Sequence, residues 1–356
     1  MTNIIYEYQE LCKDNHKDLI THIKNNTPLH KYFKEDWGKL KAQQYCGIIN
    51  YDGEDFYILP KIANYDNDVN LNIFVYMLMY AFNINVKNED LANAQNHQSN
   101  NILEVFIQMF AKNLFQQLQK GIYKEYVTEQ DNLTVLRGKY LINENLKYNF
   151  TKSKIYCEYD EFSMNNELNQ FFLYAIKTLM NYTKNKKLLK MCELVFDEVE
   201  FKQFDINNLH IHFNRLNNRF KDSFEFALLL LKKSIPMFDN GKKNFAFLFD
   251  MNELFEDFIG NVYKNIDSTT KLQNERNFRN LKLIPDIVCN DLIIDVKYKL
   301  AKDKGDLKRD DKYQMFVYGT NFDIKDTMLL YPEYNNIKVN EDLKLGKDDK
   351  MVGLKM

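Results

Sequence analysis

Two aspartates and a lysine, Asp286, Asp295 and Lys297, have the residue types that phosphodiester chemistry requires. Carboxylates bind a hard divalent cation such as Mg²⁺, which keeps coordination positions open for a phosphate and for water. A lysine ammonium beside them can orient the attacking water or stabilise charge that develops on the phosphate. The set therefore indicates metal-assisted hydrolysis of a phosphodiester, provided that the fold brings the three side chains together.

A short β-hairpin is the element that must position them. Runs rich in Ile, Leu and Val flank Asn290 and Asp291, a dipeptide that tolerates the left-handed backbone of a tight turn. With these two residues as the loop, Asp286 faces Asp295, and period-two alternation puts Lys297 on the same side. Opposed β carbons lie about 5 Å apart, so two unscreened carboxylates would repel each other, and a cation between them would relieve the repulsion. The alternative is a surface hairpin whose lysine only pairs with an aspartate.

Helices are expected on both sides of the hairpin. The helix before it has an apolar stripe at helical spacing, made of Met251, Leu254, Phe255, Phe258, Ile259 and Val262. Glu256 borders that stripe and is the third acid best placed to join the two aspartates, with Glu253 as the fallback; an ordinary amphipathic helix with exposed acids is equally compatible. The helix after the hairpin, over about 311–319, puts Gln314 and Tyr318 one turn apart. The segment DTMLLYP then reads as a last buried strand.

The hairpin also resembles a known motif, since Pro285-Asp286 followed by Asp295-Val296-Lys297 is similar to the PD-(D/E)XK signature of nucleases. The resemblance implies that the two acids bind metal and that the lysine assists hydrolysis. The predicted order of helix, three strands, helix and strand is that of the core of this nuclease fold.

Length and composition suit two domains with separate cores. The chain has 356 residues, of which 45% are hydrophobic and 28% charged, and a net charge of -2, so there is no global basic field to hold nucleic acid. The five cysteines are scattered without zinc spacing, which is typical of reduced thiols in a cytoplasm. We expect no leader or membrane span, and the sequence contains no GxxxxGK[ST] phosphate loop.

A change of character near Tyr156, from strand-like sequence to a long helix capped by Ser163, predicts the domain boundary. We expect an α+β or α/β chain, in which residues 1–155 form a domain of mixed β-hairpins and helices. Residues 156–356 would form a PD-(D/E)XK, restriction-endonuclease-like domain with a central mixed sheet flanked by helices.

Three further segments carry local predictions. Asp52-Gly53 is a strong hairpin turn signal. The run TVLRGKYLI reads as a strand that Arg137-Gly138 interrupts near its middle, and Arg137 is either a solvated edge residue or a contact to phosphate or an acidic partner surface. The lysines of the Lys184–Lys190 cluster could meet DNA phosphate, although lysines near a helix end are commonly explained by the helix dipole.

Segments spread through most of the chain resemble, in order, the McrC family, the nuclease subunits of McrBC-type 5-methylcytosine restriction systems. They are YCGII, ILPKI, LRGKYLI, YDEFSMNNELNQ, LFDMNELFEDF, IPDIV, IIDVKYK, YQMFVYG and LLYP. The resemblance implies that Asp286, Asp295 and Glu256 bind Mg²⁺, or Mn²⁺ in its place, and act in catalysis with Lys297. Gln314 and Tyr318 match a QxxxY element that accompanies such cores in some nucleases.

The family further implies a partner. McrC-like subunits work with McrB, an AAA+ GTPase ring that binds the GTP, recognises modified DNA and translocates, while the McrC-like subunit stimulates GTP hydrolysis and cuts double-stranded DNA. The domain expected over residues 1–155 is the part that would contact the ring. A non-catalytic subunit that only activates an AAA+ NTPase ring is the main alternative, and a DNA-binding module without catalysis is a third.

Overall fold

The computed structural model describes residues 3–12, 16–63, 66–82, 102–150, 153–239, 242–299, 308–334, 340–345 and 350–355. The chain forms two compact units, of which the first combines Met1–Ile102 with Lys233–Met356 and the second is Leu103–Lys232. The fold class is confirmed, because the chain is α+β with several mixed sheets and helices. None of the helices in the described part of the chain has an apolar stretch long enough to cross a bilayer.

The units differ from the two consecutive domains expected from the sequence, because the boundary expected at residues 155 and 156 falls inside the second unit. Strand β10 (Lys242–Asp250) returns to pair with β4 (Tyr45–Tyr51), where Phe247 lies opposite Ile48. Residues that follow the second unit therefore complete a sheet begun before it. A pairing between segments so far apart in the chain leaves no local signal in the sequence.

The first unit contains a five-stranded sheet, which we call the first sheet, in the order β1-β5-β4-β10-β9. Its remaining strands are β1 (Asn3–Tyr6), β5 (Glu54–Leu59) and β9 (Ser234–Asp239). Strand β1 runs parallel to β5 and the other pairs are antiparallel. The predicted turn between β4 and β5 is confirmed, since Asp52 and Gly53 have φ angles of 52° and 82°. Around the sheet lie α1 (Lys17–Asn25), the 3-10 helix η1 (Thr27–Tyr32), α2 (Asn67–Ala81) and the hairpin β2 (Phe33–Asp36) to β3 (Lys39–Ala42).

The first unit also contains a six-stranded sheet, which we call the second sheet, in the order β11-β14-β15-β16-β18-β17. Its strands are β11 (Lys271–Leu272), β14 (Ile287–Cys289), β15 (Leu292–Val296), β16 (Asp326–Leu330), β17 (Asn340–Leu345) and β18 (Lys350–Lys355). Strands β15, β16 and β18 are parallel neighbours. Helix α9 (Met251–Ile266) and the hairpin β12 (Arg276–Phe278) to β13 (Leu281–Leu283) precede β14. Strand β16 matches the predicted DTMLLYP strand, but it is not the last, because β17 and β18 extend the sheet.

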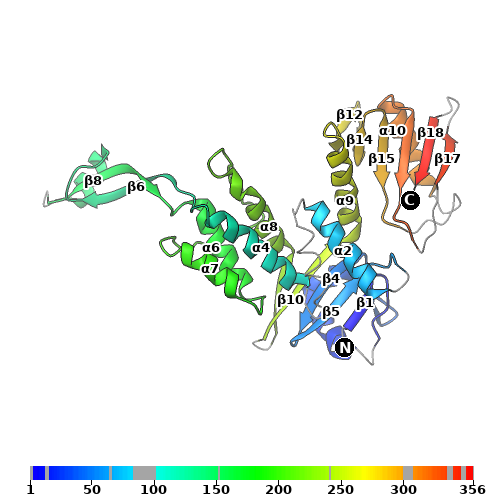
Figure 1. The fold of residues 1–356 in the computed structure, drawn as a ribbon, viewed down its shortest axis with the longest axis horizontal. Helices are drawn as coiled ribbons and strands as arrows, with labels where there is room; N and C mark the ends of the chain where they lie inside the picture. The colour runs from blue at the N-terminus through cyan, green and yellow to red at the C-terminus, as the bar shows by residue number, and fades with distance from the viewer. Residues whose placement is uncertain are drawn as a thin grey trace. The chain divides into compact units, whose positions relative to one another are not determined.

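Helix α10 (Arg309–Asn321) covers one face of the second sheet, as Figure 1 shows. Its Met315 and Tyr318 pack in one buried cluster with Ile293 of β15 and Leu329 of β16. Because side chains alternate along a strand, the face of β15 that carries Ile293 also carries Asp295. The helix therefore closes over the face on which the two acids and the lysine were predicted.

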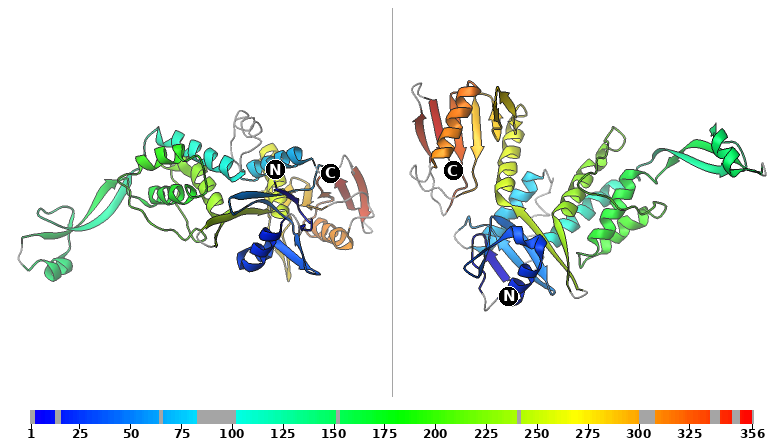
Figure 2. Two further views of the ribbon diagram at one scale, coloured as in Figure 1. Left: turned by 90° about the horizontal axis from the view of Figure 1, so that it is seen from below. Right: turned by 180° about the vertical axis from the view of Figure 1, so that it is seen from behind.

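The second unit consists of a helical part and a β-ribbon. Its helices are α4 (Ile102–Leu118), α6 (Glu167–Leu179), α7 (Lys187–Val195), the 3-10 helix η2 (Asn218–Phe220) and α8 (Lys221–Lys233). The ribbon pairs β6 (Glu125–Leu133) with β8 (Ile155–Ser163) and includes β7 (Lys139–Tyr140) and the short helix α5 (Ile142–Tyr148). Figures 1 and 2 show the ribbon extending away from these helices.

Two local predictions in this unit need correction. The segment TVLRGKYLI is a strand only at Lys139 and Tyr140 (β7), because β6 ends at Leu133; the predicted interruption is present, since Gly138 has a φ angle of 67°, which a regular strand does not allow. Helix α6 is capped by Asn166 rather than Ser163, because the Asn166 side chain accepts a hydrogen bond from the backbone N–H of Asn169 at 3.1 Å. Ser163 instead accepts from the N–H of Asn165 at 3.0 Å.

Candidate active site

The predicted hairpin is present and in the predicted register. Ile287 of β14 lies opposite Ile294 of β15, and Asn290 in the turn has a left-handed φ of 48°. Asp286 directly precedes β14, and its Oδ2 accepts a hydrogen bond from the backbone N–H of Val296 at 2.7 Å. This bond holds the Asp286 carboxylate beside the strand that carries Asp295.

Lys297 completes the group. Its Nζ lies 2.6 Å from Oδ2 of Asp295, and the two side chains come from alternate positions on one side of the chain. The backbone N–H of Lys297 donates to the carbonyl of Leu330 at 2.8 Å, which fixes the segment after β15 against the end of β16. The structure thus brings together the two aspartates and the lysine that the motif predicted.

The site is more buried than a hairpin with one charged surface would be. Asp295 is only 1% exposed, and its neighbours Ile293 and Ile294 are fully buried, so both faces of β15 are covered. Oδ1 of Asp295 has no hydrogen-bond partner among the described residues. A buried carboxylate oxygen without a donor is costly, so this atom marks a position that a cation or a water would occupy.

Burial and crowding shift the ionisation of this group. Burial, with the Asp286 carboxylate nearby, raises the pKa of Asp295 to about 6, although Lys297 opposes the shift. The pKa of Asp286 is also raised by burial, against the Val296 N–H and Lys297. Burial lowers the pKa of Lys297, but the carboxylates of Asp295, Asp286 and Asp311 together outweigh that effect, and the pKa is raised overall. At neutral pH the lysine is therefore an ammonium, and the two carboxylates favour any further positive charge.

Glu256 joins the group from helix α9, as the helical pattern predicted. Glu256 is half-buried, whereas Glu253 is exposed and has Lys233 as a distant ion partner at 3.9 Å. Burial, and then the charges of Asp286, Asp257 and Asp295, raise the pKa of Glu256 to about 7. The Glu256 carboxylate is therefore close enough to the two aspartates to be affected by their charges.

Gln273 is a member of the site that the sequence did not predict. Its side chain donates to Glu256, and its backbone N–H donates to the carbonyl of Asp286 at 2.9 Å. Its φ of 45° is unusual for a residue with a side chain, and such backbones concentrate at functional sites. A glutamine outside any motif gives no signal in the sequence, and only the fold reveals this contact.

Gln314 and Tyr318 lie one turn apart on α10, as predicted, and they contact the backbone that precedes Asp286. Nε2 of Gln314 donates to the Tyr318 hydroxyl at 2.9 Å, and that hydroxyl donates to the carbonyl of Ile284 at 3.0 Å. Ile284 lies two residues before Asp286. The pair therefore fixes the backbone that leads into the first acid rather than forming a hydrogen bond with an acid itself.

A second ion pair, also not predicted, lies at the edge of the site. Lys299, two residues after Lys297, pairs with Asp311 in the first turn of α10, and Asp311 is only 8% exposed. The Asp311 carboxylate contributes to the raised pKa of both Asp295 and Lys297. This pair joins the end of β15 to α10 and sets part of the field at the acids.

The residues fit a cation held by two carboxylates better than one held by three. No three His, Cys, Asp or Glu side chains in the described residues have the arrangement of a metal cluster. Gln273 donates to the Glu256 carboxylate. Asp286 and Asp295 come from one hairpin, and Oδ1 of Asp295 is buried and accepts no hydrogen bond from the described residues. Such a pair suits Mg²⁺, which prefers one or two carboxylates and retains several waters.

The raised pKa of Asp295 predicts a specific pH dependence of stability without divalent cations. A carboxyl whose pKa rises on folding stabilises the fold fully below its ordinary pKa of 3.8, and that contribution is lost as the pH rises through about 6. At a pH below 3.8, Asp295→Asn should therefore unfold at the same temperature as the wild type. At neutral pH the variant should be more stable by roughly 1 to 3 kcal/mol.

Thermal unfolding in EDTA across this pH range checks the prediction. Mg²⁺ added at neutral pH should raise the unfolding temperature of the wild type but not that of Asp295→Asn, because a cation that binds only the folded state stabilises it. Equal unfolding temperatures of wild type and variant at every pH would show that Asp295 carries no burial penalty.

Comparisons with known proteins show the family to which the chain belongs. A family model described as "McrBC 5-methylcytosine restriction system component" matches residues 40–332. The chain belongs to this family. No curated protein matches the chain.

Two solved structures share the fold. One is the refined half-complex from a tetradecameric assembly of Thermococcus gammatolerans McrB AAA+ hexamers with bound McrC, with a TM-score of 0.67 and 24% identity over 100% of this chain and 94% of that chain. The other is the cryo-EM structure of the Thermococcus gammatolerans McrBC complex, with a TM-score of 0.54 and 26% identity over 78% of this chain and 89% of that chain. The first likeness extends the shared fold over the whole chain.

Proposed function

We propose that this chain is the DNA-cleaving subunit of a GTP-driven, McrBC-like restriction complex, a Mg²⁺-dependent endonuclease of the PD-(D/E)XK type. The observation that carries the proposal is the pair of acids, the buried Asp295 and the half-buried Asp286, with Lys297 at 2.6 Å from Asp295, in a chain of the McrBC family. Two carboxylates rarely lie together away from solvent without a cation, because burying each charge costs free energy.

The roles of the residues follow from their contacts. Asp286 and Asp295 would hold Mg²⁺, and Glu256 would act as a supporting acid once Gln273 releases it. A bound Mg²⁺ would supply Lewis-acid polarisation of the phosphate and favour deprotonation of a water. Lys297, whose pKa is raised so that it stays an ammonium, is placed to orient the water or to stabilise charge on the phosphate. Gln314 and Tyr318 act indirectly, through the backbone before Asp286.

The partner we propose is a McrB-like AAA+ GTPase ring, as in the complexes that share this fold. The chain has no phosphate loop of its own and a net charge of only -2, so a partner would supply the GTPase and most of the affinity for double-stranded DNA, methylated or not. The complex would act on DNA in the cytoplasm.

The β-ribbon of the second unit is the part we expect to contact the ring. Large apolar side chains are strongly exposed along it, namely Tyr126, Val135, Leu136, Ile142, Leu146, Tyr148, Phe150 and Phe162. An apolar surface of this density on a protruding element is typical of a protein interface. Most of the ribbon falls within residues 1–155, the part in which the sequence predicted the partner contact.

Reconstitution with a McrB-like AAA+ protein tests the proposal. The full chain, the partner, GTP and plasmid DNA, in methylated and unmethylated form, are incubated with Mg²⁺ or with EDTA. We expect faster GTP hydrolysis when the chain is added, and DNA cleavage that requires both the chain and Mg²⁺. Stimulated GTP hydrolysis without cleavage of either DNA would favour the purely regulatory subunit, and DNA binding without either activity would favour a binding module.

A further inference from the structure

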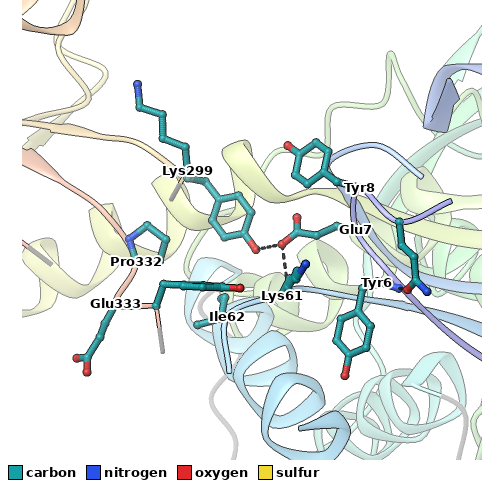
Figure 3. Close-up of a pocket in the computed structure, with 11 residues that line it drawn as sticks. Tyr6, Glu7, Tyr8, Lys61, Ile62, Lys299, Pro332 and Glu333 are labelled. Atoms are coloured by element: carbon teal, nitrogen blue, oxygen red, sulfur yellow. Dashed lines mark hydrogen bonds between the residues drawn. The ribbon is translucent and has the colours of Figure 1, made fainter. Parts of the chain in front are cut away.

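A cavity of about 360 Å³ in the first unit lies where the end of β1 meets the ends of β15 and β16. Its walls are rich in tyrosine, with Tyr6, Tyr8, Tyr298 and Tyr334 contributing. Tyr298 directly follows Lys297, so the cavity begins one residue beyond the candidate active site. Figure 3 shows the Glu7 carboxylate at its centre.

Glu7 is the unusual group in this cavity. The residue is 5% exposed, and its Oε1 accepts hydrogen bonds from the Lys61 N–H at 2.8 Å and from the Tyr298 hydroxyl at 2.7 Å. Its other oxygen, Oε2, is buried and accepts no hydrogen bond from the described residues. Burial raises the pKa of Glu7 in spite of its two donors. An acceptor left without a donor in this way costs about 1 to 3 kcal/mol, so the position calls for a donor from a ligand.

Tyr8 borders the carboxylate and can uncover it. The ring lies next to Glu7 in Figure 3, and the residue is 51% exposed, so its movement breaks little packing. Its φ of 59° is a left-handed conformation, which is strained for a bulky residue and is characteristic of ligand-binding sites. A ligand that displaces this ring would reach Oε2.

The charges of the cavity favour a neutral ligand with amino donors. Its lining contains two acids, Glu7 and Glu333, and two lysines, Lys61 and Lys299, so neither a cation nor an anion is favoured overall. Lys299 is paired with Asp311, and its amino group points away from Glu7 in Figure 3. Flat tyrosine rings with one carboxylate acceptor suit a planar aromatic ring that carries an amino group.

A nucleobase has this chemistry. Cytosine, adenine and guanine each carry an exocyclic amino group, whereas thymine carries none. Enzymes that take a base out of the stack read it by hydrogen bonds to its edge and by stacking on aromatic side chains. The cavity volume of about 360 Å³ falls in the range of about 300 to 1,000 Å³ that is usual for small-molecule sites.

We propose that this cavity binds one unstacked, amino-bearing nucleobase, whose exocyclic amino group donates to Oε2 of Glu7 while Tyr8 and its neighbouring tyrosines stack on the ring. The source of the base, a DNA strand held at the adjacent acids, rests on the proposed function. The capture of the base itself depends only on the cavity.

Saturation-transfer NMR with the full chain and each of the four deoxynucleosides, in EDTA and without the partner, tests the proposal. Deoxycytidine, deoxyadenosine or deoxyguanosine should receive saturation, and thymidine should bind about tenfold more weakly, because a hydrogen bond to a buried carboxylate is lost. Glu7→Gln should weaken the binding of the nucleosides that carry an amino group by a similar factor. Tyr8→Asn should weaken the binding of every nucleoside, because the stacking ring is lost. Asparagine is chosen because it tolerates the positive φ of this position.

Glu10→Gln is the matched control, because Glu10 lies three residues after Glu7 and its carboxylate pairs with Lys39 at 2.8 Å on the surface. This variant should bind the nucleosides as the wild type does. Absence of saturation for all four nucleosides, equal binding of thymidine, or unchanged binding by Glu7→Gln with an unaltered unfolding temperature would overturn the proposal. Because the assay uses no metal, partner or cleavage, its failure leaves the nuclease proposal standing, and loss of the nuclease proposal leaves this result standing.

Discussion

Asp295→Asn is expected to lower DNA cleavage by about a thousandfold or more, because charge stabilisation of this kind supplies several kcal/mol in metal-assisted hydrolysis. The asparagine keeps the shape of the side chain but removes the negative charge that would hold the cation, and it leaves Lys297 without its partner at 2.6 Å. The measurement is the rate of plasmid cleavage with the AAA+ partner, GTP and Mg²⁺. Stimulation of GTP hydrolysis should stay at the wild-type level, since the substitution is buried in the second sheet.

Asp291→Asn is the control for this prediction. Asp291 is an exposed acid in the turn of the same hairpin, so its substitution makes the same chemical change without touching the buried group. Cleavage by this variant should equal that of the wild type. If Asp295→Asn cleaves as fast as Asp291→Asn, Asp286 and Asp295 do not form the catalytic site.

Leu136→Asp is expected to weaken the stimulation of the partner's GTP hydrolysis, and with it DNA cleavage, by about tenfold or more, since burying an unpaired carboxylate in an interface costs several kcal/mol. Leu136 lies in the turn after β6 and is 54% exposed, so a carboxylate there costs the isolated chain little. In the complex the same carboxylate would have to be buried without a partner. The measurement is the concentration of chain that gives half-maximal GTP hydrolysis.

Leu194→Asp provides the matched control. Leu194 is 74% exposed and lies on α7 of the same unit, outside the ribbon. It should leave GTP hydrolysis unchanged. An equal effect of both substitutions, or none from Leu136→Asp, would place the ring contact elsewhere on the chain.

The hairpin could be predicted from the sequence because all of its determinants are local. Asn290 and Asp291 specify the turn, the turn fixes the register, and the register puts Asp286 beside Asp295. Glu256 was predicted for the same kind of reason, since helical periodicity alone separates it from Glu253. Where one turn or one helix decides the geometry, the pattern of residues is enough.

The rest of the site depends on contacts that no local pattern encodes. Gln273 donates a hydrogen bond to Glu256, and Lys299 pairs with Asp311. Glu7 accepts a hydrogen bond from Tyr298, which lies 291 positions later in the chain. The burial of Asp295 was likewise not predicted, because period-two alternation does not show that α10 covers the polar face. The division into units was missed for the same reason, since β10 pairs with β4 across the whole second unit.

The stability of the site and its proposed chemistry have one origin. Burial and mutual repulsion raise the pKa of Asp295 to about 6 and that of Glu256 to about 7, so the folded protein carries unfavourable charge at neutral pH. A cation would relieve that cost, and the same positive charge would polarise a phosphate. Strain of this kind is the expected signature of a site built for a ligand rather than for the fold alone.

Anomalous diffraction from crystals of the full chain soaked in Mn²⁺ tests the central claim most directly, because Mn²⁺ takes the oxygen ligands that Mg²⁺ prefers. The account predicts one strong peak within about 2.0 to 2.3 Å of carboxylate oxygens from both Asp286 and Asp295, and no peak there in Asp295→Asn. The account would be contradicted if the protein used for the crystals cleaves DNA fully with Mn²⁺ but the crystals show no peak at Asp286 and Asp295, or show the ion bound elsewhere.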